Sequence, residues 1–336
     1  MKRHKNYLLI VLILAGTSIF PSQNIKAQDK VSVDNGYYIT YPDRLTLRLF
    51  LSQKYAPFTI SADDNDKDLN YKTTSKLTLG AGFTYKSLTL NLSYGFGFLN
   101  PEKGRGKTKG LDFQFHLYPK KWSIDLLGTF KNGYYLDPKD DNGLSLANYY
   151  QRPDFKRSII GLSVFRVPNS GKFSYRAALN QNDWQTKSAG SVLYGGEAYF
   201  GSIKGDSALV PSQGNGNFKQ AGIDKINFVS IGPGIGYAYT LVIAKNFFIT
   251  GSAIGSIDVN FSSEEKGSGK MKATSIIPGG IYKGAVGYNS STWSVSAIIA
   301  GNALYIGSES SSKEYFIPTG NLRFTIAKKL GSKTRS

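Results

Sequence analysis

Apolar and polar residues alternate along short segments through most of this 336-residue chain. In RLTLRLFL (44–51) every second residue is leucine, and the residues between the leucines are Arg, Thr and Phe. The pattern continues through 76–86 and 87–98 and returns in 247–261 and 321–330. Because successive side chains of a β-strand point to opposite faces, each segment is predicted to be a strand with one apolar and one polar face. An all-β fold follows.

Alternation alone suits both a soluble β-sandwich and a membrane β-barrel, and three further features favour the barrel. The polar faces are rich in Gly, Ser, Thr and Asn, which suits a crowded barrel interior. Aromatic residues stand near the predicted strand ends, as in the interfacial girdles of barrels. Short turns, such as Lys86-Ser87 and Asn289–Ser291, alternate with long polar stretches. The long stretches are 52–74, 99–109, 131–156, 203–224, 262–272 and 307–320.

We therefore predict an antiparallel up-and-down transmembrane β-barrel of about twelve strands, with about fourteen as the alternative. Short turns are expected at Pro119–Lys121, Pro168–Gly171 and Ala244–Asn246. The alternation of short and long connections breaks between Asn180 and Lys225, where the strand boundaries stay open. The barrel is expected to span residues 44–330.

The N-terminus has the three parts of a secretory signal peptide. Basic residues lie at its start, an apolar stretch covers 7–20, and Ala27 is a small residue suited to cleavage. A membrane anchor is the alternative, but the apolar stretch is short for a span of about 20 residues. The sequence predicts a cleaved signal peptide (1–27), an N-terminal lead-in (28–43), the barrel and a polar tail (331–336). The expected location is the bacterial outer membrane.

The formal net charge is +18, with 41 basic against 23 acidic residues, and there is no cysteine. Without cysteine the chain forms no disulfide and no cysteine-linked lipid anchor. A nucleic-acid partner is not expected, because no binding module is recognisable in an exported chain. The expected partners are outer-membrane lipid and the barrel-assembly machinery, with anionic solutes as candidates that the positive charge would attract.

Four stretches together resemble the Gram-negative outer-membrane family catalogued as domain of unknown function 4421. They are TYPDRLTLRLFLSQKY (40–55), YYQRPDF (149–155), FSYRAALNQNDWQTKSAGS (173–191) and PGIGYAYTLVIAKNFFITGSAIG (233–255). The resemblance implies a β-barrel in the outer membrane and supplies no activity. The chain departs from the habit of barrels that end on an aromatic residue, because it continues past Phe324 into GSKTRS (331–336).

Charged residues on the predicted polar faces are the candidates for lining the lumen. If their positive charges are unpaired, the interior favours anions. If they are paired with acids, they lock a filled barrel, since an unpaired buried charge is costly. The candidates are Arg48, Lys76, His116, Asp125, Arg176, Glu197, Lys283 and Arg323.

His116 is the one histidine outside the predicted signal peptide, and it raises the question of a hydrolase. A catalytic histidine needs an orienting group and a nucleophile within reach. Asp112 lies on the same face but about 13 Å away at the rise of a strand. We therefore expect no enzyme and no catalytic residue. With one histidine and no cysteine, we also expect no metal site and no cofactor.

Arg152 and Asp154 flank Pro153 beside a long predicted loop. We expect Pro153 to fix the entry to a strand and the Arg152–Asp154 pair to close a turn there; a binding tip or a salt-bridged latch folded into the barrel is the alternative. For the whole chain we expect a small channel or transport-related, porin-like barrel with a basic lumen. A plugged structural or binding barrel is the alternative, and a membrane hydrolase is a less favoured one.

Overall fold

The structure is a computed structural model that describes residues 33–41, 44–62, 67–85, 88–101, 103–119, 121–140, 144, 146–214 and 216–330. The predicted signal peptide (1–27) and polar tail (331–336) lie outside the described residues. None of the helices in the described ranges is long and apolar enough to cross a membrane.

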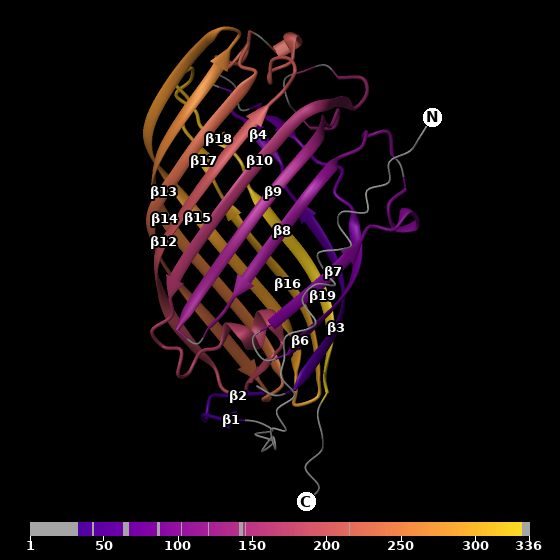
Figure 1. Ribbon diagram of the computed structural model, residues 1–336, viewed down its shortest axis with the longest axis vertical. Coiled ribbons are helices and arrows are strands. Elements are labelled where there is room, and N and C mark those ends of the chain that lie inside the picture. The colour runs from indigo at the N-terminus through magenta and orange to yellow at the C-terminus, as the bar shows by residue number, and fades with distance from the viewer. Residues whose placement is uncertain are drawn as a thin grey trace, which may run out of the picture. The chain divides into compact units, whose positions relative to one another are not determined.

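Twelve antiparallel strands form one curled sheet that makes the wall of a barrel (Figure 1). Apart from β7 and β8, each wall strand pairs with the wall strands before and after it in the chain, and the first pairs with the last. The wall strands are β3 (Leu45–Tyr55), β6 (Leu77–Tyr85), β7 (Leu88–Tyr94), β8 (Lys109–Leu117), β9 (Trp122–Leu136), β10 (Tyr150–Arg166), β12 (Ala189–Lys204), β13 (Lys225–Ile243), β14 (Phe247–Lys266), β15 (Gly269–Asn289), β16 (Trp293–Ala303) and β19 (Thr319–Leu330).

This topology confirms the predicted antiparallel up-and-down barrel and the preferred count of strands. One pairing departs from full closure. Over their described residues, β7 and β8 are not paired with each other, so the two edges of the sheet lie there.

Strand β14 shows why the alternating sequence forms this wall. Exposed and buried residues alternate along almost its whole length. Phe247, Ile249 and Phe261 point outward and are exposed, whereas Ser256 and Asn260 point inward and are buried. An apolar outer face and a polar inner face are what a barrel wall in lipid requires.

The expected turns at Ala244–Asn246 and Asn289–Ser291 are present at one end of the barrel, here called the short-turn end, whereas Lys86-Ser87 lies outside the described residues. In the β13–β14 turn, Ala244 and Lys245 both have positive φ values, 49° and 64°. Two such residues in succession match the twist of a tight hairpin. At the opposite, long-loop end, the long loop expected over 262–272 is wrong: β14 and β15 continue as paired strands to a tight turn at Gly267. There the polar residues are strand residues, so polarity alone misplaced the loop.

The connection between β10 and β12 is the exception at the short-turn end. The expected turn at Pro168–Gly171 instead begins a long segment that contains the helical turn η2 (Arg176–Asn180) and strand β11 (Asp183–Gln185). Strand β11 pairs with β2 (Tyr38–Thr40), which pairs with β1 (Val33–Asp34). We call residues 172–185 the plug. Alternation is lost in the plug from Ala178 on, which explains why the strand boundaries near Asn180 could not be placed.

Connections at the long-loop end also fold inward. Strands β4 (Phe58–Ile60), β5 (Leu69–Tyr71), β17 (Tyr305–Ile306) and β18 (Tyr315–Phe316) form a four-stranded sheet in that region (Figure 1). Their apolar side chains pack with inward-facing residues of the wall, including Phe155, Ile203 and Phe228. The remaining short helices are η1 (Gly97–Leu99) and η3 (Ser212–Gly214).

A second apolar core lies toward the short-turn end. The plug residues Phe173, Tyr175 and Leu179 pack there with wall residues such as Phe165 and Leu193. Side chains of folded-in connections therefore occupy the interior of the barrel at both ends.

Candidate functional site

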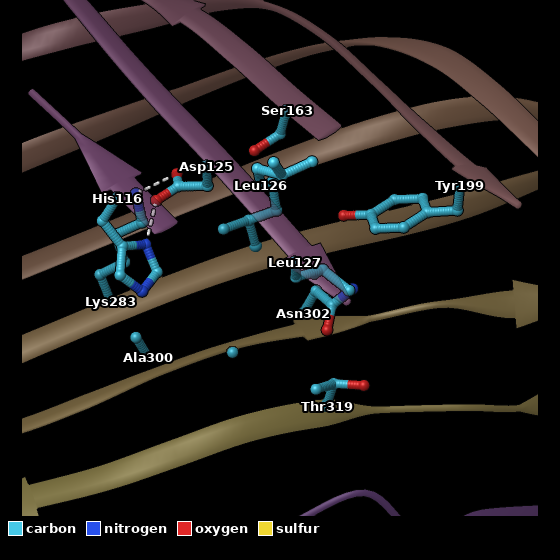
Figure 2. A pocket seen from close by; sticks show the side chains of 12 residues that line it. His116, Asp125, Leu126, Leu127, Ser163, Tyr199, Lys283, Ala300, Asn302 and Thr319 are labelled. Atoms are coloured by element: carbon cyan, nitrogen blue, oxygen red, sulfur yellow. Dashed lines mark hydrogen bonds and ion pairs between the residues drawn. The ribbon is translucent and has the colours of Figure 1, made fainter. Parts of the chain in front are cut away.

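A cavity of about 50 Å³ lies inside the barrel, lined by apolar and polar side chains of strands from several parts of the wall (Figure 2). Its lining includes His116 of β8, Asp125 of β9, Ser163 of β10, Lys283 of β15 and Asn302 of β16. A space of about 50 Å³ has room for a few water molecules beside these polar groups. We call its charged members, His116, Asp125 and Lys283, the lumen triad.

The lumen triad is organised around one carboxylate. His116 and Asp125 stand directly opposite each other on β8 and β9, and His116 Nδ1 lies 2.5 Å from Asp125 Oδ1. Lys283 Nζ donates to Asp125 Oδ2 at 2.6 Å and to Ser123 Oγ at 3.1 Å. The Lys283 side chain is only 4% exposed, so Asp125 is the counter-charge that its burial requires.

Two aromatic rings connect the lumen triad to the plug. Lys283 Nζ lies 5.0 Å from the ring centre of Tyr118 and 5.2 Å from that of Tyr175, a plug residue. A buried ammonium gains from facing aromatic rings at this range. The Tyr175 hydroxyl also hydrogen-bonds Ser252 Oγ on β14 at 2.6 Å. Lys283 therefore contacts both the plug, through Tyr175, and the charged wall residue Asp125.

Asp112, the acid considered from the sequence as a partner of His116, is engaged elsewhere. It forms an ion pair with Lys131 on β9. The acid that holds His116 is the cross-strand neighbour Asp125. Finding it from the sequence would have required the register of β8 against β9 across the turn at Pro119–Lys121.

Two arginines of the wall hold the plug by its backbone. Arg48 Nη2 donates to the carbonyl oxygen of Asn180 at 2.9 Å and to Asn182 Oδ1 at 3.1 Å. Arg323 Nη2 donates to the carbonyl oxygen of Leu179 at 3.0 Å. Both predicted lumen residues therefore point inward, and they bind neutral acceptors rather than carboxylates.

Another inward-facing arginine, Arg157, was not among the candidates. It is fully buried and donates to the carbonyl oxygens of Pro57 and Pro318, at 2.7 and 3.2 Å, and to Thr319 Oγ1 at 2.5 Å. It thereby ties β10 to two connections of the long-loop end. The sequence signal that could have identified Arg157 as inward-facing is its place between Phe155 and Ile159 on one face of β10.

Glu197 is buried on the inner face, as expected for a lumen residue, and hydroxyl groups hold it. Ser256 Oγ donates to Glu197 Oε1 at 2.6 Å, and the Tyr199 hydroxyl donates to Oε2 at 3.0 Å. Nearby, Ser230 Oγ donates to Asp258 Oδ2 at 3.1 Å. Together with the lumen triad, these acids and hydroxyls form a polar part of the inner face of the wall.

Two of the candidate residues do not line the lumen wall. Lys76 is exposed at the long-loop end, because β6 begins only at Leu77 and leaves Lys76 outside the wall. Arg176 belongs to the plug, where it lies 3.6 Å from Asp183. Burial raises the pKa of the Asp183 carboxyl, and Arg176 and the Ser174 hydroxyl oppose that shift.

Arg152 and Asp154 form a bidentate pair on β10, with distances of 2.9 and 2.7 Å. Arg152 also donates to the carbonyl oxygens of Ala208 and Ser207, at 2.8 and 3.1 Å. The Asp206 backbone N–H donates to Asp154 at 2.9 Å. The pair thus fastens the β12–β13 loop to β10, which is the geometry of a latch.

A model of the family described as "Domain of unknown function (DUF4421)" matches residues 32–327. No curated protein matches the chain. Among solved structures, the outer membrane protease OmpT from Escherichia coli is similar at 11% identity and a TM-score of 0.35, covering 86% of this chain and 97% of that one. Neisserial surface protein A is similar at 10% identity and a TM-score of 0.21, covering 85% and 97%.

A mutant of the TodX monoaromatic hydrocarbon channel is similar at 8% identity and a TM-score of 0.26, covering 87% of this chain and 91% of that one. We draw nothing about function from likenesses at this level.

Proposed function

This chain belongs to the family described as "Domain of unknown function (DUF4421)", and from that premise we propose that it is a bacterial outer-membrane barrel closed at rest. Its role is structural or ligand-binding, exerted at its two ends. The long-loop end faces the cell exterior and the short-turn end faces the periplasm, as in other outer-membrane barrels. Outer-membrane lipid surrounds it, and the barrel-assembly machinery inserts it.

The observation that carries this proposal is the double occupancy of the lumen. At the long-loop end, Phe58, Tyr71 and Phe155 belong to a core with almost no exposed surface. At the short-turn end, the plug packs against the wall and is held by Arg48 and Arg323. A hydrated solute would have to displace both closures, because they lie in series along the barrel.

The lumen triad supports a role without catalysis. His116 contacts Asp125 through one carboxylate oxygen, and Lys283 binds the other. Asp125 thereby balances the buried charge of Lys283, and among the described residues no hydroxyl group is hydrogen-bonded to His116 as a nucleophile would be. We therefore propose no hydrolase activity.

Reconstitution of the purified protein into planar lipid bilayers tests the closed barrel. We expect no channel openings in wild-type protein across a range of salt concentrations, because packed side chains of the described residues fill the lumen toward both ends. Heat-modifiable migration of the same preparation in detergent gels is the control that the barrel is folded. Discrete, reproducible openings from folded protein would contradict the closed state.

A gated form of the channel expected from the sequence is the second candidate. Arg48, Arg157 and Arg323 are held by neutral carbonyl, amide and hydroxyl oxygens, and among the described residues no bound carboxylate cancels their charge. If both closures moved, such a lumen would favour anions. The same recordings under a KCl gradient test this candidate. Openings whose reversal potential lies toward that of chloride would favour the gated anion channel over the closed barrel.

A further inference from the structure

A basic pocket of about 340 Å³ lies on the surface at the long-loop end, beside the edge strand β7. It is lined by the segment that precedes β6 and by the β7–β8 connection. Its basic side chains are Lys76, Lys103, Arg105 and Lys107. Over the part of the pocket that the structure describes, no carboxylate contributes to the lining. The connection 95–108 holds three basic residues and one acid, Glu102, in the sequence.

The connection that forms the pocket is fastened at several points. Arg105 lies over the rings of Tyr135 and Tyr149, at 5.8 and 5.5 Å from their centres. Thr108 Oγ1 donates to the Gly133 carbonyl at 2.7 Å and accepts from the Thr74 backbone N–H at 2.8 Å. Arg105 is therefore engaged in holding the loop. Lys76, Lys103 and Lys107 are the charges available to a ligand.

An exposed aromatic surface runs from β7 up to this pocket. Tyr94, Phe96 and Phe98 are 68%, 37% and 77% exposed. Their rings form a continuous series, with centres 5.1 Å apart for the first pair and 5.5 Å for the second. Leu99 and Asn100, which follow directly, already line the pocket. Apolar surface and positive charge thus adjoin along a single short segment.

We propose that this pocket binds the phosphate head group of an outer-leaflet glycolipid, whose acyl chains lie against Tyr94, Phe96 and Phe98. The proposal rests on the membrane location proposed above. Lysines attract phosphate as point charges, and each one near a membrane surface adds to the affinity for anionic lipid. Aromatic rings favour the same interfacial depth, where one side is apolar and the other is wet.

Binding of lipid A to detergent-purified protein, measured by native mass spectrometry, tests the proposal. We expect wild type to retain lipid A and the variant Lys76→Gln/Lys103→Gln/Lys107→Gln to bind it about tenfold or more weakly, through loss of three cations. The matched control is Lys270→Gln/Lys272→Gln, which removes two exposed lysines of β15 near the β14–β15 turn at the same end. That control should bind lipid A as wild type does.

Two further arms separate a lipid from a free anion. The variant Phe96→Ser/Phe98→Ser should weaken lipid A binding, and inorganic phosphate should compete only weakly. Equal lipid A binding by the triple lysine variant, with its heat-modifiable migration intact, would overturn the proposal. Full competition by inorganic phosphate would also overturn it, by identifying a free-anion site. Lipid A binding is measured in detergent and does not depend on whether the barrel is closed. Channel openings in bilayers would therefore contradict the closed barrel and leave the lipid A result unchanged.

Discussion

Replacing Asp125 by alanine is expected to lower the free energy of unfolding of the barrel by about 3 to 5 kcal/mol. The substitution leaves Lys283, which is 4% exposed, buried without its counter-charge. It also removes the partner of His116. Denaturant titration of the protein in detergent, followed by tryptophan fluorescence, measures the loss.

The double variant Asp125→Ala/Lys283→Met serves as the decisive control for this prediction. Without a buried ammonium, most of the lost stability should return, so the two substitutions should be strongly non-additive. Glu265→Ala removes a partly exposed partner of Lys225 and should cost less than about 1 kcal/mol. Additive losses in the double variant would show that Asp125 does not act by neutralising Lys283.

Replacing Phe155 by alanine is expected to loosen the closure at the long-loop end. Phe155 is fully buried, and its ring centre lies 4.8 Å from those of both Tyr71 and Tyr134. Truncating a buried phenylalanine costs about 3 to 5 kcal/mol. Leu209 and Val210 of the β12–β13 loop belong to the same core. We therefore expect limited proteolysis to cut this loop in the variant and to spare it in wild type.

Phe261→Ala is the matched control for the proteolysis experiment. Phe261 lies on the outer face of β14 and is 51% exposed, so its loss should leave the core at the long-loop end intact. The loop should stay protected in this variant. Equal cleavage of wild type and Phe155→Ala would mean that the core does not hold the loop.

The wall of the barrel could be predicted because its determinants are local. Alternation in segments such as 44–51 and 247–261 sets both the strand and its lipid-facing side. The plug could not be predicted in this way. In FSYRAALN (173–180) the alternation stops after Ala177, and the segment is held by distant residues such as Arg48 and Arg323. Its structure depends on tertiary contacts that no short-range pattern encodes.

The interior could be predicted only in part. Alternation placed Arg48, Asp125, Lys283 and Arg323 on the inner face, but the partner of each depends on strand register and on folded-in connections. Near the long-loop end the inner face becomes apolar, because it packs against those connections. The inner face is not generally polar there, so alternation does not reveal Arg157, which lies on that face between the apolar residues Phe155 and Ile159.

Spin-label scanning along β14 tests most directly whether lipid covers the outside and side chains fill the inside. Single labels from 247 to 261, in protein reconstituted in bilayers, would be probed with oxygen and with a water-soluble nickel complex. We predict that the outward positions, such as 249 and 257, are accessible to oxygen and protected from nickel, and that the inward positions, such as 254 and 260, are protected from both. Nickel access at the inward positions would show a water-filled lumen, and nickel access at the outward positions would place the apolar face in water; either result would contradict the closed membrane barrel.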